Sequence, residues 1–197
     1  MIAETDTGGA FGRIDCPVLV TRRLVMRQPH VDDVEDLTRL AGNRRIAEML
    51  TRMPHPYGEA EARAFIELAT DPARAEASYV LTLAATGAFI GCAGLRPVAG
   101  GFDLGYWIGE PFWGEGYATE AAHALVDLAF RASDADCVAA SCRVTNAASQ
   151  RVIHKCGFQY CGQGMLNSIA AGQVTVVRYR LDRKTWIGLR SWSRTSQ

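Results

Sequence analysis

Apolar and polar residues recur along this chain with two periods, one of two residues and one of three to four, which predict strands and helices respectively. From Val34 to Ala41 the apolar residues return at helical spacing behind Asp32 and Asp33, two acids suited to a first helical turn. Gly116 opens a longer helix with small apolar side chains along one stripe. The predicted helices span residues 32–41, 60–68, 116–132 and 146–156, and the predicted strands span 18–28, 79–84, 89–96, 102–108, 137–144 and 174–181, with a short seventh over 158–161.

Short connections decide how the middle strands pair. Only residues 86–87 and 99–101 separate three successive strands, and loops of that length favour an antiparallel meander. The order of elements therefore indicates a layered α/β or α+β fold, a sheet with helices on its faces. A chain of 197 residues with 48% hydrophobic content suits one domain. We expect that domain over residues 18–186, after a flexible N-terminus (1–17) and before a polar C-terminal tail (187–197).

The charge balance excludes several classes of partner. Lysine plus arginine equals aspartate plus glutamate at 21 each, which argues against nucleic acid or an anionic membrane as a partner. We find neither an apolar run of the roughly 20 residues that a bilayer requires nor a basic-then-apolar leader, and we expect a cytoplasmic protein. The six cysteines show no metal-ligand spacing, so no metal is expected.

The most informative segment passes from a predicted strand through a glycine turn directly into a helix. It begins at Tyr106, ends at Thr119 and contains Gly114 and Gly116. At a helix start the first N–H groups lack internal partners and the helix dipole is positive, so backbone alone can bind a diphosphate. By itself the pattern is weak, because an ordinary strand-to-helix turn can look the same.

Two other phosphate-binding motifs fit this segment less well. The third glycine of a dinucleotide-binding fingerprint would fall on Thr119, and that fold requires parallel strands joined by crossovers. A Walker-type loop requires Lys-Ser or Lys-Thr after the glycines, and neither follows Gly116.

Four segments in this order resemble the GNAT family of acyl-CoA-dependent N-acetyltransferases, in particular the branch similar to the ribosomal-protein-alanine N-acetyltransferases. They are the opening strand 21–27, the stretch 104–122 around the glycine turn, the Asn146 to Phe158 signature (N-x-x-S followed by K-x-G-F) and the closing strand 178–186. One departure is Pro111, where the broader family often has Gln or Arg. Because a diphosphate cradle is mostly backbone, this departure weakens the resemblance little.

The resemblance implies a mixed, largely antiparallel twisted sheet of about six to seven strands with about four helices on its faces, and acetyl-CoA as co-substrate. In this family the pantetheine arm enters a gap between two separating strands, which implies backbone pairing near Trp107 and Ile108. Asn146 would bond the pantetheine or, alternatively, only cap the next helix. The implied diphosphate cradle consists of Gly114, Glu115, Gly116, Tyr117, Ala118 and Thr119.

Two residues are candidates for the chemistry that the resemblance implies. Ser149 would donate a proton to the leaving thiolate, unless it is only a solvent-facing serine of the first helical turn. Much of the family uses instead a tyrosine at the position of Ile153, so Ser149 or water must act as the acid here. Asp103 is the candidate base for the attacking amine, unless it is only a solvated strand-end carboxylate. Glu110 and Glu115 are expected to point outward, because a diphosphate would repel them.

The implied reaction is direct acetyl transfer from acetyl-CoA to a primary amine in a ternary complex. No cysteine intermediate is needed, since no histidine partner is identifiable for any cysteine. The acceptor stays open among a protein N-terminus, an amino acid, a polyamine and a drug amine, and residues 44–58 and the loops after Gly162 are expected to select it. A homodimer is compatible with the resemblance. The alternative is a non-catalytic acyl-CoA-binding regulatory module on the same fold, which would keep the cradle but release no thiol.

Overall fold

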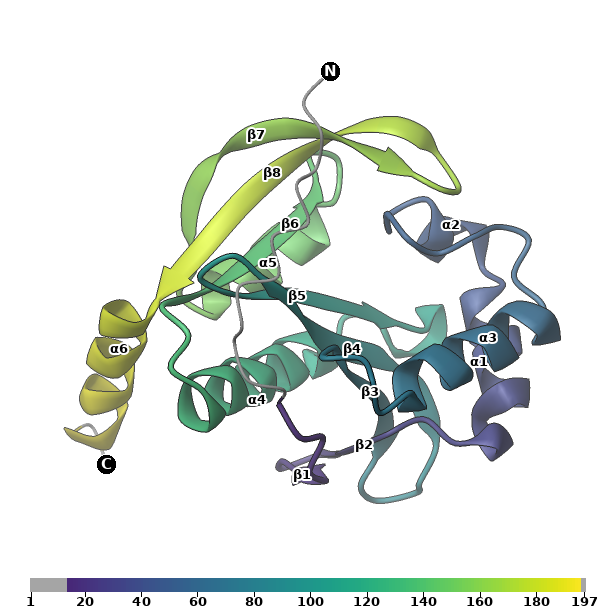
Figure 1. Ribbon diagram of the computed structural model, residues 1–197, viewed down its shortest axis with the longest axis horizontal. Helices are drawn as coiled ribbons and strands as arrows, with labels where there is room; N and C mark the ends of the chain where they lie inside the picture. The colour runs from purple at the N-terminus through teal and green to yellow at the C-terminus, as the bar shows by residue number, and fades with distance from the viewer. Residues whose placement is uncertain (1–13, 196–197) are drawn as a thin grey trace.

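A computed structural model describes residues 14–195 of the chain as one layered α/β structure around a single eight-stranded sheet. The strand order is β1-β2-β3-β4-β5-β6-β8-β7, and every neighbouring pair is antiparallel except β5 and β6 (Figure 1). This confirms the predicted fold class and the meander of β3, β4 and β5. The strands are β1 (Leu19–Val20), β2 (Leu24–Arg27), β3 (Ala77–Leu83), β4 (Phe89–Val98), β5 (Gly101–Ile108), β6 (Cys137–Arg143), β7 (Gln159–Ser168) and β8 (Gly172–Asp182).

Helices cover both faces of the sheet. On one face α4 packs against β4, β5 and β6, with α5 beside it, and on the other α1 and α3 pack against β4 and β3 (Figure 1). The helices are α1 (Val34–Ala41), α2 (Arg44–Ala47), α3 (Glu59–Thr70), α4 (Tyr117–Ala132), α5 (Ala147–Lys155) and α6 (Arg183–Thr195), with two 3₁₀ turns, η1 (Val31–Asp33) and η2 (Glu110–Phe112).

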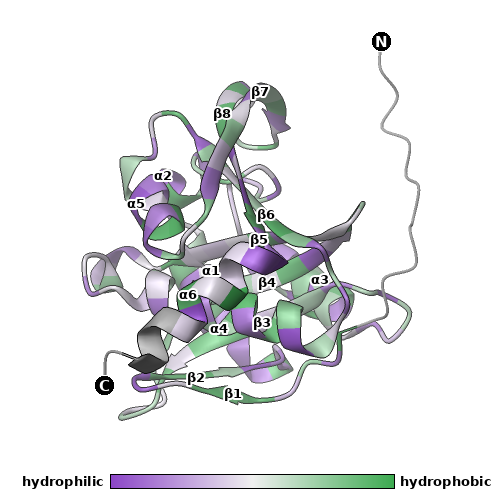
Figure 2. Cartoon of the chain, turned by 90° about the vertical axis from the view of Figure 1, so that its left-hand side faces the viewer, coloured by the Kyte–Doolittle hydropathy of each residue, from purple (hydrophilic) through white to green (hydrophobic). Residues whose placement is uncertain are grey.

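The sheet has a core on each side because its central strands are apolar on both faces. The larger core lies under α4, which buries the small residues Ala121, Ala122 and Ala129 together with Leu125. Small side chains let the helix axis approach the sheet closely. The strands of the sheet carry much of the apolar colouring in Figure 2. The smaller core, between α1, α3 and the sheet, includes Val34, Leu37, Leu40, Ala62, Val80, Phe89 and Cys92.

Strands β5 and β6 separate halfway along their length. They pair only from Gly101 to Leu104 of β5, against Cys137 to Ala140 of β6. Beyond that point β5 stays on β4 as far as Ile108, while β6 stays on β8. At Gly91 the backbone of β4 comes so close to β5 that an added Cβ would lie 2.2 Å from the Trp107 carbonyl oxygen. The sheet thus opens between two edges that no other strand pairs.

Three segments differ from the sequence expectations. Ile14, which precedes the expected domain boundary at residue 18, is buried in the larger core. The last pair of strands is longer than expected, because β7 is ten residues long and pairs with β8 along its length, with a bulge between Tyr160 and Gly162. The segment after Trp186 continues as helix α6, where the Trp186 indole donates to Asp127 and its ring lies 5.1 Å from Phe130. Residues 1–13 of the expected flexible N-terminus and 196–197 of the tail lie outside the described residues.

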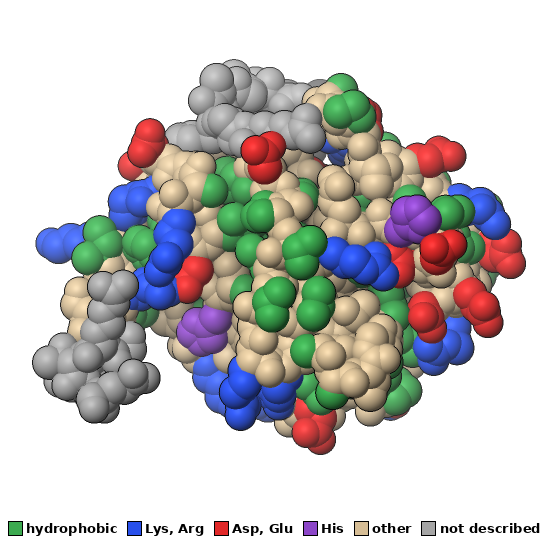
Figure 3. Space-filling view, turned by 90° about the horizontal axis from the view of Figure 1, so that it is seen from below, with side chains coloured by type: hydrophobic (Ala, Val, Ile, Leu, Met, Phe, Trp, Pro, Cys, Tyr) green, Lys and Arg blue, Asp and Glu red, His purple; other side chains and the backbone are tan. Residues whose placement is uncertain are grey.

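The surface is mixed in charge. On the face shown in Figure 3, basic and acidic side chains alternate around a group of hydrophobic ones. None of the helices within residues 14–195 has the length and apolar character needed to cross a bilayer.

Candidate active site

A cleft of about 1350 Å³ lies where β5 and β6 separate. Its walls are the turn before α4, the first turn of α5, the loop after α2 and the open strand edges. It brings together every candidate site residue except Glu115, namely Asp103, Trp107, Ile108, Gly114, Gly116, Tyr117, Ala118, Thr119, Asn146 and Ser149.

The turn before α4 leaves backbone amides free to bind an anion. Gly114 and Gly116 have φ values of 85° and 81°, in the left-handed region that a side chain disfavours. The first i to i−4 bond of the helix runs from the Glu120 amide to the Gly116 carbonyl at 3.1 Å. The amides of residues 117–119 therefore precede the helical ladder and lie at its positive end.

An ion pair between Arg23, just before β2, and Glu120 of α4 holds this turn in place. The Glu120 carboxylate accepts bonds from the Arg23 side chain, the Arg23 amide and the Thr21 hydroxyl at 2.7–2.8 Å. Arg23 also donates to the Glu115 carbonyl at 2.9 Å and lies over the Tyr117 ring. Desolvation acts to raise the pKa of Glu120, but the bonds from Thr21 and Arg23 outweigh it and hold that pKa below its ordinary value.

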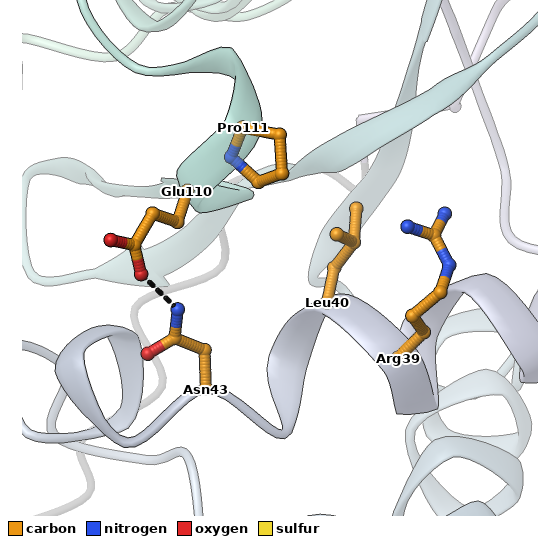
Figure 4. A pocket seen from close by; sticks show the side chains of 5 residues that line it. All are labelled: Arg39, Leu40, Asn43, Glu110 and Pro111. Atoms are coloured by element: carbon orange, nitrogen blue, oxygen red, sulfur yellow. Dashed lines mark hydrogen bonds between the residues drawn. The ribbon is translucent and has the colours of Figure 1, made fainter.

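Glu110 points away from the α4 terminus, as expected. Its carboxylate is bound by Asn43 and Arg45, and Figure 4 shows Asn43 reaching it beside a small hollow of about 320 Å³. The Arg45 guanidinium also lies 5.1 Å from the centre of the Trp113 ring. The Trp113 indole donates to the Ile108 carbonyl at 2.6 Å, which leaves one lone pair on that oxygen for another donor.

Asn146 is the N-cap of α5, because its side-chain oxygen accepts from the Ser149 amide at 3.0 Å. Capping is thus established for the side-chain oxygen. No described residue accepts from the Asn146 amide nitrogen, which stays able to donate to a ligand in the cleft.

Tyr106 is a site residue that our sequence interpretation missed. Its hydroxyl lies 2.9 Å from the Ser149 hydroxyl, so Ser149 is not simply exposed to solvent. Burial raises the pKa of Tyr106 strongly, and the bond to Ser149 opposes that shift. The alternation of side chains along β5 could have identified it. Phe102 and Leu104 are buried on the α4 side of β5, and Tyr106, two residues further on, faces the same side.

Asp103 lies on the opposite face of β5, toward α3. Its carboxylate, with 29% of the side chain exposed, forms an ion pair with Arg96 at 3.0 Å. Burial raises the pKa of Asp103, although Arg96 and, more weakly, Arg52 act to lower it. The opening between β5 and β6 gives one cleft access to both faces, so a carboxylate on one side and a hydroxyl pair on the other share it.

Comparisons with known proteins agree with this geometry. The family profile described as Acetyltransferase (GNAT) domain matches residues 23–159. The uncharacterized N-acetyltransferase p20 of Bacillus licheniformis is 24% identical over 72% of this chain and 82% of its own. A similar fold is that of the ribosomal L7/L12 α-N-protein acetyltransferase RimL in complex with coenzyme A, with a TM-score of 0.69 and 22% identity over 84% of this chain and 97% of that one. Another is that of spermidine N-acetyltransferase of Vibrio cholerae in complex with CoA and spermine, with a TM-score of 0.71 and 18% identity over 85% of this chain and 99% of that one.

Proposed function

The chain belongs to the GNAT acetyltransferase family, and from that premise we propose that it transfers an acetyl group from acetyl-CoA directly to a primary amine in a ternary complex. The observation that carries the proposal is the Tyr106–Ser149 hydroxyl pair, which lies in the same cleft as the free amides of the α4 N-terminus. The acceptors named for two similar folds, a ribosomal protein and spermidine, support an amine.

The residues present fit coenzyme A. The amides of residues 117–119 would hold the diphosphate, and the unpaired edge of β5 near Trp107 and Ile108 would pair with the pantetheine. The Asn146 amide nitrogen would add a donor. When bound, acetyl-CoA would supply the acetyl group, held as a thioester, and would leave as the free thiol.

The protein's own groups would hold and move two protons. Ser149 donates to the leaving sulfur, and Tyr106 holds the serine hydroxyl in position. Asp103, directly or through water, accepts the proton of the amine from the other face of β5. Bringing both reactants into one cleft turns their encounter into a step within a complex, which is a large part of the catalysis.

The cysteines support direct transfer. Burial raises the pKa of Cys142 and raises that of Cys156 to about 12, so neither thiol is a ready nucleophile near neutral pH. A ping-pong route through these cysteines therefore has no activated thiolate.

Thiol release from acetyl-CoA over a panel of amines tests the proposal, with Ser149→Ala as the control. We expect amine-dependent release that this substitution sharply reduces. Tight CoA binding without thiol release on any amine would instead favour the non-catalytic acyl-CoA-binding regulatory module. A cytoplasmic location and a homodimer stay predictions, which cell fractionation and light scattering would check.

A further inference from the structure

Arginines form a strip on the face of β6 and β8 that also carries Asp103 in the neighbouring strand β5. Side chains alternate between the two faces of a strand. Cys142 of β6 and Tyr179 of β8 are buried in the core on the α5 side. Arg143 and Arg178 consequently point to the other face, the one that carries Asp103, and Arg180 follows two residues further along β8.

The strand register places this strip beside the cleft. Asp103 of β5 pairs with Ala139 of β6, which in turn pairs with Arg180 of β8. Arg178 lies opposite Ser141, a residue of the cleft wall, and Arg143 itself lines the cleft. The arginine strip, meaning Arg143, Arg178 and Arg180, therefore starts at the cleft and runs along the strands next to the candidate base.

The three guanidinium groups of the strip have no direct ion-pair partner in the described chain, and Arg180 only lies near enough to Asp182 to lower the pKa of that carboxyl. For these three arginines, no carboxylate oxygen within residues 14–195 lies within 4.0 Å of a guanidinium nitrogen. Arg143 donates to the Glu48 carbonyl at 2.6 Å, and the Arg178 guanidinium lies over Gly164, where an added Cβ would meet it at 2.6 Å.

The acids that line the cleft are, by contrast, already engaged. Glu76 is bound by Arg52, and Asp103 by Arg96. Glu48 is bound by Arg44, and Glu61 accepts from the Gly58 amide. A polycationic acceptor would find three of these four carboxylates already paired with arginines, whereas an anionic acceptor would meet guanidinium groups that have no ion pair.

The length of the strip favours an extended chain over a small molecule. Arg143 pairs with Val176 of β8, and Arg180 lies four positions further along that strand, so the strip is roughly 13 Å long. A peptide in extended form places alternate side chains roughly 7 Å apart, which matches the spacing of Arg178 and Arg180. On the neighbouring strand β7, Gly162 and Gly164 carry no side chains that would obstruct such a chain.

We propose that the acceptor is the amino terminus of a polypeptide whose following residues are acidic, bound along the arginine strip with its terminal amine in the cleft. This inference rests on the proposed acetyl transfer to an amine and names the acceptor class of the same site. The acidic side chains pair with Arg178 and Arg180, while Arg143 binds the segment nearest to the reacting amine.

The test compares three short peptides that share the first residue and continue with acidic, neutral or basic residues, alongside spermidine and a free amino acid. We expect kcat/KM to be about tenfold or more higher for the acidic peptide than for the neutral one, with the difference in KM. The preference should shrink as salt is raised, because these charges are exposed.

Charge reversal separates recognition from a structural effect. In the double variant Arg178→Glu, Arg180→Glu we expect the acidic peptide to lose its advantage and the basic peptide to gain it. Arg131→Glu, at an exposed arginine of α4 on the other side of the sheet, is the matched control and should leave the preference unchanged. Thermal unfolding of both variants checks that the fold is kept.

The outcomes distinguish this inference from the proposed function. Equal kcat/KM for the three peptides, a preference that survives the reversal, or acetylation of small amines alone would overturn the acidic peptide while leaving amine acetylation in place. Thiol release on none of the amines would overturn both.

Discussion

The hydroxyl oxygen of Tyr106 lies 2.9 Å from that of Ser149, although the residues are 43 positions apart. Tyr106 comes from β5 and Ser149 from the first turn of α5, so the bond spans the opening of the sheet. The Tyr106 hydroxyl also reaches the Ser149 carbonyl at 3.3 Å. Two contacts with Tyr106 thus hold Ser149 on one wall of the cleft.

This contact predicts how much each of the two residues contributes to kcat. We expect Ser149→Ala to lower kcat by roughly 100-fold, the usual scale of a lost general acid, with little change in KM for acetyl-CoA. Tyr106→Phe, which removes one hydrogen bond, should lower kcat by about tenfold. Steady-state thiol release measures both effects.

The double variant is the control for that prediction. If Tyr106 acts through Ser149, the double variant loses about as much as Ser149→Ala alone, because the tyrosine has nothing left to position. Losses that multiply would show instead that Tyr106 acts independently.

The proposed role of Asp103 as the base predicts a particular pH dependence of kcat/KM. A base must be deprotonated, and burial raises the pKa of Asp103 above its ordinary 3.8, so activity should fall at higher pH than for an exposed aspartate. Below the pKa of the amine, log kcat/KM should fall by about one per pH unit and steepen where Asp103 is protonated. In Arg96→Gln the lost guanidinium raises that pKa further, and the steepening should begin at higher pH.

Asp103→Asn is the matched variant, and its profile should show no steepening. The measurement is kcat/KM against pH at saturating acetyl-CoA for all three proteins. Superimposable profiles would assign proton removal to water and leave Asp103 as a strand-end carboxylate.

The glycine turn predicts linked losses of stability and affinity. Alanine at Gly114 or Gly116 would have to adopt a φ above 80°, at a cost of about 1–2 kcal/mol, or else shift the amides. Either response should weaken CoA binding by about tenfold, which calorimetry measures. Gly188→Ala in α6, where an added Cβ meets nothing within 4 Å, is the control and should leave affinity unchanged. Unaltered affinity in both turn variants would contradict a backbone cradle.

Glu120 predicts a stability that depends on pH. Its pKa is lower in the folded chain than the ordinary 4.5, so its contribution is present above pH 4.5 and is lost as the pH falls through the folded-state value. We expect Glu120→Gln to lower the free energy of unfolding by about 2 kcal/mol at pH 7, and by less in acid. Urea unfolding at both pH values measures this. Glu115→Gln, with no ion pair among the described residues, should change stability by under about 0.5 kcal/mol.

Local pattern was sufficient for most of the fold. The meander of β3, β4 and β5 followed from short loops, and α4 followed from a stripe of small residues after Gly116. The period failed at β7, whose residues Gln159 to Ser168 are mostly exposed and therefore lack an apolar alternation. The periodicity also did not indicate helix α6 after Trp186, because that helix is held by tertiary contacts such as the ion pair between Arg190 and Asp127.

By itself the sequence determined the fold class and the glycine turn, because turn chemistry and helix starts depend on neighbouring residues, and the family resemblance added the candidates Asn146 and Ser149. Only the tertiary structure decided that Tyr106 meets Ser149, that the opening of the sheet gives one cleft access to both faces of β5, and that Arg143, Arg178 and Arg180 form one strip. These relationships depend on strand register and on where β5 leaves β6. Both are set by packing between segments far apart in the chain, which no local pattern records.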